Sequence, residues 1–257
     1  MSEHLFDHWR SALGRWRIPD EILAQAPESP WIHPVELFEV VGEIPDSPSH
    51  RAARAALGES LLDVGCGGGR AAFACVPPAL HVIGVDHQPV MLERFQATAT
   101  ARGVTAETVL GDWPEAAPRT PVADVVTCHH VLYNVAELEP FVRELTAHAR
   151  RRVVVEIPMH HPLADLAPWW RHFWGLERPD GPTARDAAAC IASLGLAVHV
   201  EEHEPSVTPS AFDEETLVRF MRIRLCLPAS RDAEVREFMR SQSPRSRTNV
   251  TLWWDVD

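Results

Sequence analysis

The segment LLDVGCGGGR (61–70) combines an acid with a run of glycines. Asp63 is followed by Gly65, Gly67 and Gly69 at alternate positions. Glycine adopts positive φ in a tight turn and lets the backbone approach a ligand without a Cβ in the way. A helix that begins behind such a turn presents its first amides to that ligand. The segment therefore predicts a ligand-binding loop, although a glycine-rich turn alone is equally compatible with a structural bend.

Two further acids follow apolar segments that resemble buried strands. Asp86 ends the run HVIGVD, where its carboxylate could accept hydrogen bonds from both hydroxyls of an adenosine ribose. Asp112 ends the next run, where it could accept from an adenine amino group, and Trp113 could lie against the base. Taken alone, Asp112 could equally cap a turn. Because three acids follow three successive strands, the sequence predicts an adenosine-binding cleft.

The acid before the loop helps to choose among adenosine cofactors. The dinucleotide fingerprint G-x-G-x-x-G fails when it is counted from Gly65, because Arg70 stands at its last position. A shifted match that ends at Ala72 keeps a nicotinamide cofactor open. Asp63 favours a cofactor with an ammonium group, which the acid could hold directly or through water.

Strands and helices alternate around these residues, which predicts a mostly parallel α/β sheet covered on both faces. Ligands bind such sheets at the carboxyl ends of the strands. The predicted strands are 60–65, 81–86, 105–112, 123–128, 152–158, 197–204 and 249–256. The predicted helices are 51–58, 68–76, 91–103, 136–149 and 184–195, with two more between the last two strands.

Particular residues mark the ends of these helices. Gly58 is a predicted C-cap, and Thr183 with Asp186 forms a predicted capping box. Asp213 and Ser230 are the predicted N-caps of the last two helices.

The N-terminal region has helical patterns without a sheet of its own. Apolar residues recur at helical spacing over 5–16, a second short helix is predicted at 35–41, and 43–50 resembles a linker. We therefore divide the chain into a helical lid or extension, 1–50, and a cofactor-binding domain, 51–257. A lid would cover the acceptor pocket, and the alternative is that the apolar stripe packs on the side of the domain.

The segments LLDVGCGGG, VIGVD, GDW and ADVVTCHHVLYNV, in this order, resemble the motifs of class I S-adenosylmethionine-dependent methyltransferases. The resemblance implies a doubly wound, Rossmann-like sheet of seven strands with the last strand antiparallel, and S-adenosylmethionine as cofactor. It assigns Gly65 and Gly67 to the methionine moiety, Asp86 to the ribose, Asp112 and Trp113 to the adenine, His129 to the neighbourhood of the sulfonium and His87 to an additional contact.

Composition narrows the partners. The net charge of −12 disfavours nucleic acid, because phosphate binding needs a concentrated positive surface. No apolar run is long enough to span a membrane and no secretory signal begins the chain, so a cytoplasmic location is expected. Five scattered cysteines without a C-x-x-C pair, and histidines without a metal-binding motif, predict no metal site.

Histidine pairs follow the fourth and fifth predicted strands and supply the candidate bases. His130 and His160 are the catalytic candidates, but neither pair gives a firm assignment. Aromatic residues within 162–181 could wall an acceptor pocket or simply bury against the sheet. We expect a small, partly hydrophobic acceptor that is methylated at O, N or C. The alternatives are an RNA or protein methyltransferase, an inactive cofactor-binding module and a nicotinamide oxidoreductase.

Overall fold

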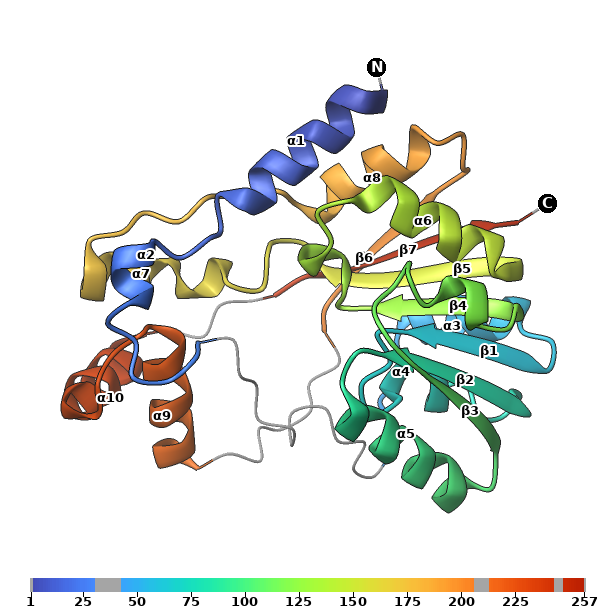
Figure 1. The fold of residues 1–257 in the computed structure, drawn as a ribbon, viewed down its shortest axis with the longest axis horizontal. Coiled ribbons are helices and arrows are strands. Elements are labelled where there is room, and N and C mark those ends of the chain that lie inside the picture. Colours follow the sequence, from blue (N-terminus) through green and yellow to red (C-terminus); the bar gives the residue numbers. More distant parts are fainter. Residues whose placement is uncertain (1, 31–42, 206–212, 243–246, 257) are drawn as a thin grey trace.

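The computed structural model describes residues 2–30, 43–205, 213–242 and 247–256. Its described residues form a seven-stranded sheet in the order β3-β2-β1-β4-β5-β7-β6 (Figure 1). The strands are β1 Ser60–Val64, β2 His81–Asp86, β3 Thr105–Leu110, β4 Ala123–His129, β5 Ala149–Pro158, β6 His199–His203 and β7 Asn249–Asp255. Strands β1 to β5 are parallel, and β7 is antiparallel to both of its neighbours. The predicted fold class is confirmed.

The helices are α1 Ser2–Gly14, α2 Asp20–Leu23, α3 Pro48–Ala56, α4 Arg70–Phe73, α5 Pro89–Arg102, α6 Leu138–Ala147, α7 Ala167–Trp174, α8 Ala184–Ala192, α9 Glu214–Arg224 and α10 Asp232–Ser241. The predicted capping box of Thr183 and Asp186 is confirmed, as is the Asp213 cap.

Three predictions about helix ends are wrong. Helix α3 begins within the predicted linker, because the Ser47 hydroxyl accepts from the His50 amide and Pro48 fits the first helical turn. Its C-cap is Leu57 in an extended conformation, one residue before Gly58. Ser230 caps nothing, since it lies inside a 3₁₀ turn that runs directly into α10.

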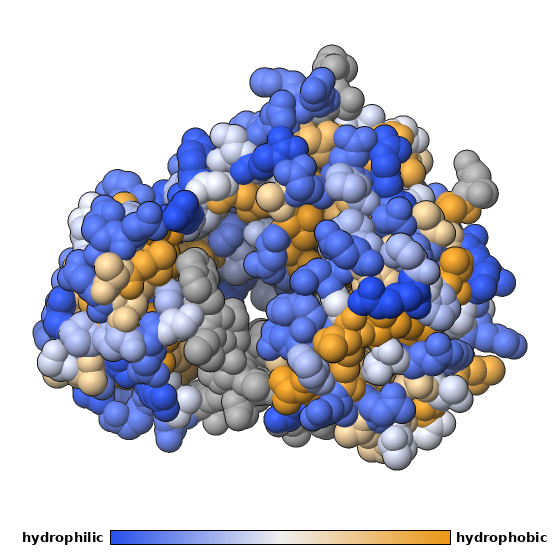
Figure 2. Space-filling model, in the orientation of Figure 1, coloured by the Kyte–Doolittle hydropathy of each residue, from blue (hydrophilic) through white to orange (hydrophobic). Residues whose placement is uncertain are grey.

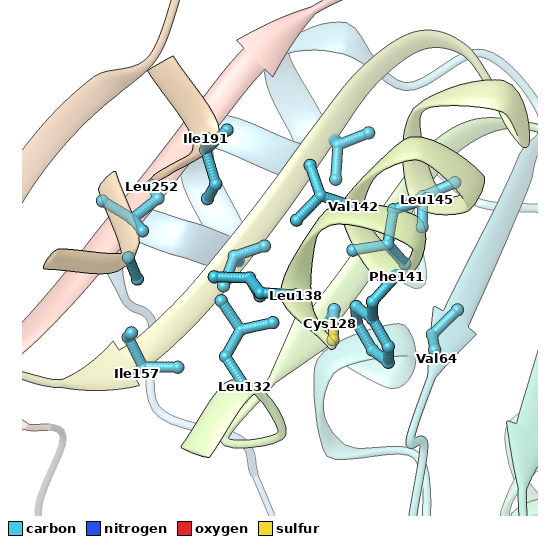
Figure 3. Close-up of a cluster of buried hydrophobic side chains, with 14 of the residues drawn as sticks. Val64, Cys128, Leu132, Leu138, Phe141, Val142, Leu145, Ile157, Ile191 and Leu252 are labelled. Carbon is cyan, nitrogen blue, oxygen red and sulfur yellow. The ribbon is translucent and has the colours of Figure 1, made fainter. Parts of the chain in front are cut away.

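Each face of the sheet carries its own apolar core. Helices α1, α6 and α8 cover one face, where Phe141 and Ile191 are among the buried residues around β4, β5 and β7 (Figure 3). Helices α3, α4 and α5 contribute Ala53, Phe73 and Phe95 to the core on the other face. The prediction that helices cover both faces of the sheet is confirmed. Most residues of β3 and β6 are exposed, because an outermost strand has a neighbour on one side only.

A third apolar cluster joins α2, α7, α9 and α10 into a helical layer beside the sheet (Figure 1). Trp170, Leu225 and Val235 are at its centre and are almost fully buried. Figure 2 shows that the visible face is hollowed between this layer and the sheet. In the described part of the chain, no helix is both long and apolar enough to cross a bilayer.

The described part of the N-terminal region packs partly on the sheet and partly on the helical layer. Helix α1 packs against α6 and α8, and the buried Trp9 donates its indole N–H to the Val135 carbonyl at 2.8 Å. Ile18 and Ile22 belong instead to the helical layer. The helix predicted at 35–41 lies outside the described residues. The domain boundary at residue 50 and the lid stay predictions, and α1 itself is part of the sheet's core.

Candidate functional site

The glycine loop after β1 has the predicted backbone conformation. Gly65, Gly67 and Gly69 have φ values of 70°, 50° and 90°, in the region that favours glycine. The Gly65 amide donates to the Val85 carbonyl at 2.8 Å, which ties the loop to β2. A Cβ on Gly65 would lie 2.4 Å from Val131 Cγ2, so any side chain at this position would overlap with Val131. Helix α4 behind the loop is a single turn, shorter than predicted.

Asp86 joins the glycine loop to the end of β2. Its carboxylate accepts from the Gly67 amide and from the Gln88 amide, each at 2.9 Å. The residue is 8% exposed, and each carboxylate oxygen keeps a second lone pair for a ligand hydroxyl. The exposed His87 stands next to it, with Nδ1 3.7 Å from Asp86 Oδ1. The structure thus brings together four of the predicted cofactor residues: Gly65, Gly67, Asp86 and His87.

Asp63 lies behind the loop rather than on its open side. It is 1% exposed and accepts from the Thr127 hydroxyl at 2.9 Å and from the Ala72 amide at 3.2 Å. Burial raises the pKa of its carboxyl to about 7. These bonds connect β1 to β4 and to α4, so the observed position supports the loop and does not present the carboxylate to a ligand.

Asp112 and Trp113 follow β3 at the same edge of the sheet. The Gly111 amide donates to the Asp86 carbonyl at 2.9 Å, which places Asp112 just beyond the end of β2. Asp112 is exposed, whereas Trp113 is half-buried. The indole meets His148 edge-on, with ring centroids 4.9 Å apart, and donates to the Phe141 carbonyl at 3.4 Å. Its ring therefore packs on α6 in this structure.

Two histidines end β4 in different environments. His129 is the last residue of the strand, and its Nε2 is buried without a hydrogen-bond partner among the described residues. Burial lowers the pKa of His129 to about 3, so its ring is neutral at pH 7. His130 has a φ of 60°, and its side chain is 52% exposed. Its Nε2 lies 3.4 Å from Glu156 Oε1.

Glu156, near the end of β5, is a buried acid that the sequence analysis missed. It stands opposite His129 on β4 and Thr251 on β7, and only 7% of it is exposed. The Ser49 hydroxyl donates to Oε2, and the Asn249 amide donates to Oε1 at 3.0 Å. Burial alone would raise the pKa of Glu156, but these bonds and the neighbouring histidines hold it well below its usual value. An acid inside the apolar run RVVVEIP was the available signal.

The other predicted base stands apart from this group. His160 is exposed and pairs with Thr183 in an isolated β-bridge. Its neighbour His161 stacks on Trp16 at 4.2 Å, and burial lowers its pKa to about 4. Most of the aromatic residues in 162–181 pack in the helical layer.

Comparisons with known proteins agree with this geometry. Residues 61–152 match a family model described as a methyltransferase domain. No curated protein matches the chain. The YcgJ protein of Bacillus subtilis has a similar structure, with a TM-score of 0.54 and 16% identity over 80% of this chain and 95% of that one.

Two further solved structures share the fold. Magnesium protoporphyrin IX methyltransferase of Synechocystis PCC 6803, with bound SAH, gives a TM-score of 0.51 and 15% identity over 81% of this chain and 82% of that one. A putative methyltransferase from Bacillus halodurans C-125 gives 0.52 and 18% identity over 80% of this chain and 96% of that one. At these identities the likeness shows a shared fold.

Proposed function

Because this chain carries a class I S-adenosylmethionine-dependent methyltransferase domain, we propose that it transfers a methyl group from that cofactor to a small, partly hydrophobic acceptor at O, N or C. The observation that carries the proposal is the bond between Asp86 and the Gly67 amide. It places a buried carboxylate beside a bare backbone loop, which suits the ribose and methionine portions of the cofactor.

The residues around the loop fit this cofactor. When bound, S-adenosylmethionine supplies a methyl group on a positively charged sulfonium, already activated for transfer. Gly65 leaves room beside Val131, where any Cβ would collide. Asp86 has lone pairs for the ribose hydroxyls. His129, which is neutral at pH 7, would not repel a nearby positive charge. Asp112 is free to reach the adenine, whereas Trp113 would have to turn away from α6.

The C-terminal arginines bear on the nature of the acceptor. As a positive surface they would favour an RNA or protein acceptor, yet most of those in the described residues are paired with acids. Arg236 lies 2.5 Å from Glu215, Arg240 lies 2.9 Å from Glu214, and Arg222 lies 2.8 Å from Asp232. Such pairs leave little positive surface for phosphates, and the net charge is −12. These observations support a small-molecule acceptor. A cytoplasmic location stays a proposal.

Binding and turnover together test the proposal. S-Adenosylhomocysteine at ~100 times its Kd should add about 2.7 kcal/mol to the free energy of unfolding, which raises the melting temperature visibly. NAD should not change it. Transfer of tritiated methyl from the cofactor to a small-molecule pool, and not to an RNA pool, is the expected activity.

Each other outcome has a definite meaning. Stabilisation by NAD alone would favour an oxidoreductase. Binding of S-adenosylhomocysteine without methylation of either pool would favour an inactive cofactor-binding module. Methylation of the RNA pool alone would show that the acceptor class is misassigned.

A further inference from the structure

The segment that follows β4 lies directly beside the glycine loop. Val131 is the residue that a Cβ on Gly65 would strike, so His130, one residue earlier, stands at the border between the cofactor loop and the acceptor side. His130 adopts a φ of 60°, which is uncommon for a residue with a Cβ. Its amide donates to the Glu156 carbonyl at 2.7 Å, and this bond helps to hold the backbone there.

The Glu156 carboxylate also lies beside the His130 ring. Nε2 is 3.4 Å from Oε1, while Nδ1 has no hydrogen-bond partner among the described residues. The half-exposed ring therefore has one nitrogen turned to a buried anion and a second nitrogen free. A base held by an acid in this way is the usual arrangement for proton removal in enzymes.

Other groups face the same carboxylate from every neighbouring element. Ser49 and His50 come from α3, His129 from β4 and His203 from β6, whose Nε2 lies 3.8 Å from Oε2. The contacts from β7 are uncharged, through Asn249 and Thr251. No three of the His, Cys, Asp and Glu side chains in the described ranges are arranged to hold a metal ion. The group is thus one anion surrounded by imidazoles and neutral donors.

We propose that His130 is the base that removes a proton from the methyl acceptor, and that Glu156 is the positioning residue that orients its ring. This inference rests on the proposed methyl transfer and narrows the acceptor to a hydroxyl, phenol or N–H group. The acceptor's O–H or N–H bond breaks, and the proton goes to His130 Nδ1. The oxygen or nitrogen forms the bond to the methyl carbon while the methyl–sulfur bond breaks, and its electron pair stays on sulfur.

The other candidate residues are less suited than His130 to act as the base. Glu156 is buried beneath α3 and cannot reach an acceptor, and His129 has a buried Nε2. His160 is bridged to Thr183 and has no carboxylate beside it among the described contacts. An imidazolium that forms on His130 would be stabilised by the ionised Glu156 at 3.4 Å.

Chemical footprinting tests this placement without an acceptor. Diethylpyrocarbonate modifies unprotonated imidazoles, and mass spectrometry gives the rate for each histidine. S-Adenosylhomocysteine should slow modification of His130 at least fivefold and leave the exposed His172 of α7 unchanged. Equal His130 rates with and without S-adenosylhomocysteine, in protein that binds it by calorimetry, would overturn the proposal.

The variant Glu156→Gln separates positioning from a structural role. Loss of the carboxylate should reduce the protection of His130 by S-adenosylhomocysteine, because the ring then no longer lies beside an anion. A variant that merely loosened α3 would instead raise the modification rate of the buried His50 of α3 together with that of His130. Unchanged protection of His130 would show that Glu156 does not orient the ring.

Turnover completes the test, with tritiated methyl transfer to the small-molecule pool as the probe. His130→Asn and Glu156→Gln should each lower the rate about 100-fold, within the range for general-base catalysis, while the Kd for S-adenosylhomocysteine changes less than threefold. His199→Asn, at an exposed position on the edge strand β6, is the matched control and should keep the wild-type rate. Wild-type rates in His130→Asn would refute the base and leave the proposed function standing. Failure of the wild type to bind S-adenosylhomocysteine would instead refute the proposed function.

Discussion

The two halves of the sheet's carboxyl edge hold their acids by different means. In the half formed by β1 and β2, Asp86 is bonded by the backbone amides of Gly67 and Gln88. In the half formed by β4, β5 and β7, Glu156 is bonded by the side chains of Ser49 and Asn249. The first half therefore depends on backbone conformation, and the second depends on which side chains occupy a few distant positions.

The halves also differ in electrostatics. The buried Asp63 receives two neutral donors, and burial raises its pKa to about 7. Glu156 is almost equally buried, but histidines surround it and its pKa is lowered. The same kind of group in the same fold thus titrates in opposite directions, because the neighbours outweigh desolvation in only one case.

Replacing Asp86 should have the largest effect, a loss of cofactor affinity, and should leave the half formed by β4, β5 and β7 unchanged. Asp86→Ala would remove the two charge-assisted bonds that we propose to the ribose, roughly 3–6 kcal/mol together, so the Kd for S-adenosylmethionine should rise about 10²–10⁴-fold. Calorimetric titration measures it, and Asp112→Ala, at an exposed site, should cost much less. Thermal unfolding of both variants is needed, because Asp86 also bonds two loop amides. Wild-type affinity in a folded Asp86→Ala protein would show that the cofactor site is misassigned.

Substitution at Gly65 tests whether the two halves are in physical contact. Gly65→Ala should destabilise the protein by roughly 2–5 kcal/mol, from its positive φ and from overlap with Val131. Urea denaturation gives the free energy of unfolding. Adding Val131→Ala removes the overlap but not the backbone strain, so the double variant should lose less than the two single losses added together. Strict additivity would indicate that the halves do not touch there.

The pH dependence of stability should show that buried groups in the two halves titrate in opposite directions. The pKa of His129 falls from 6.5 to about 3 on folding, so the unfolded state binds more protons between these values. The free energy of unfolding then decreases as the pH falls, by at most about 1.4 kcal/mol per pH unit. The pKa of Asp63 rises from 3.8 to about 7 on folding, so the folded state binds more protons between these values and stability decreases as the pH rises from about 4 to 7.

Denaturation of His129→Asn and Asp63→Asn between pH 4 and 8, each compared with the wild type, separates these contributions. The wild type should gain stability as the pH rises to about 6.5, and His129→Asn should lack the part of this gain that His129 contributes. Asp63→Asn should lack the decrease in stability that Asp63 causes in the wild type between about pH 4 and 7. Two difference curves with the same sign of slope would contradict the assigned pKa shifts.

The sequence by itself determined the fold class, the glycine loop and the contact between that loop and Asp86. These features are local, because Gly67 and Asp86 are 19 residues apart and belong to consecutive strands. Alternating apolar strands and helices leave few ways to bury both faces of a sheet. Glycines at 65, 67 and 69 then mark where positive φ is required.

Only the tertiary structure decided the half of the edge formed by β4, β5 and β7. Ser49 and Glu156 are 107 residues apart, and Asn249 lies 93 residues beyond Glu156, so no short motif contains them. The inward position of Asp63 and the packing of Trp113 on α6 were equally hidden, since an acid or an aromatic at a strand end can point either way. Side-chain networks assembled from distant segments depend on strand register and helix placement, which a local pattern does not encode.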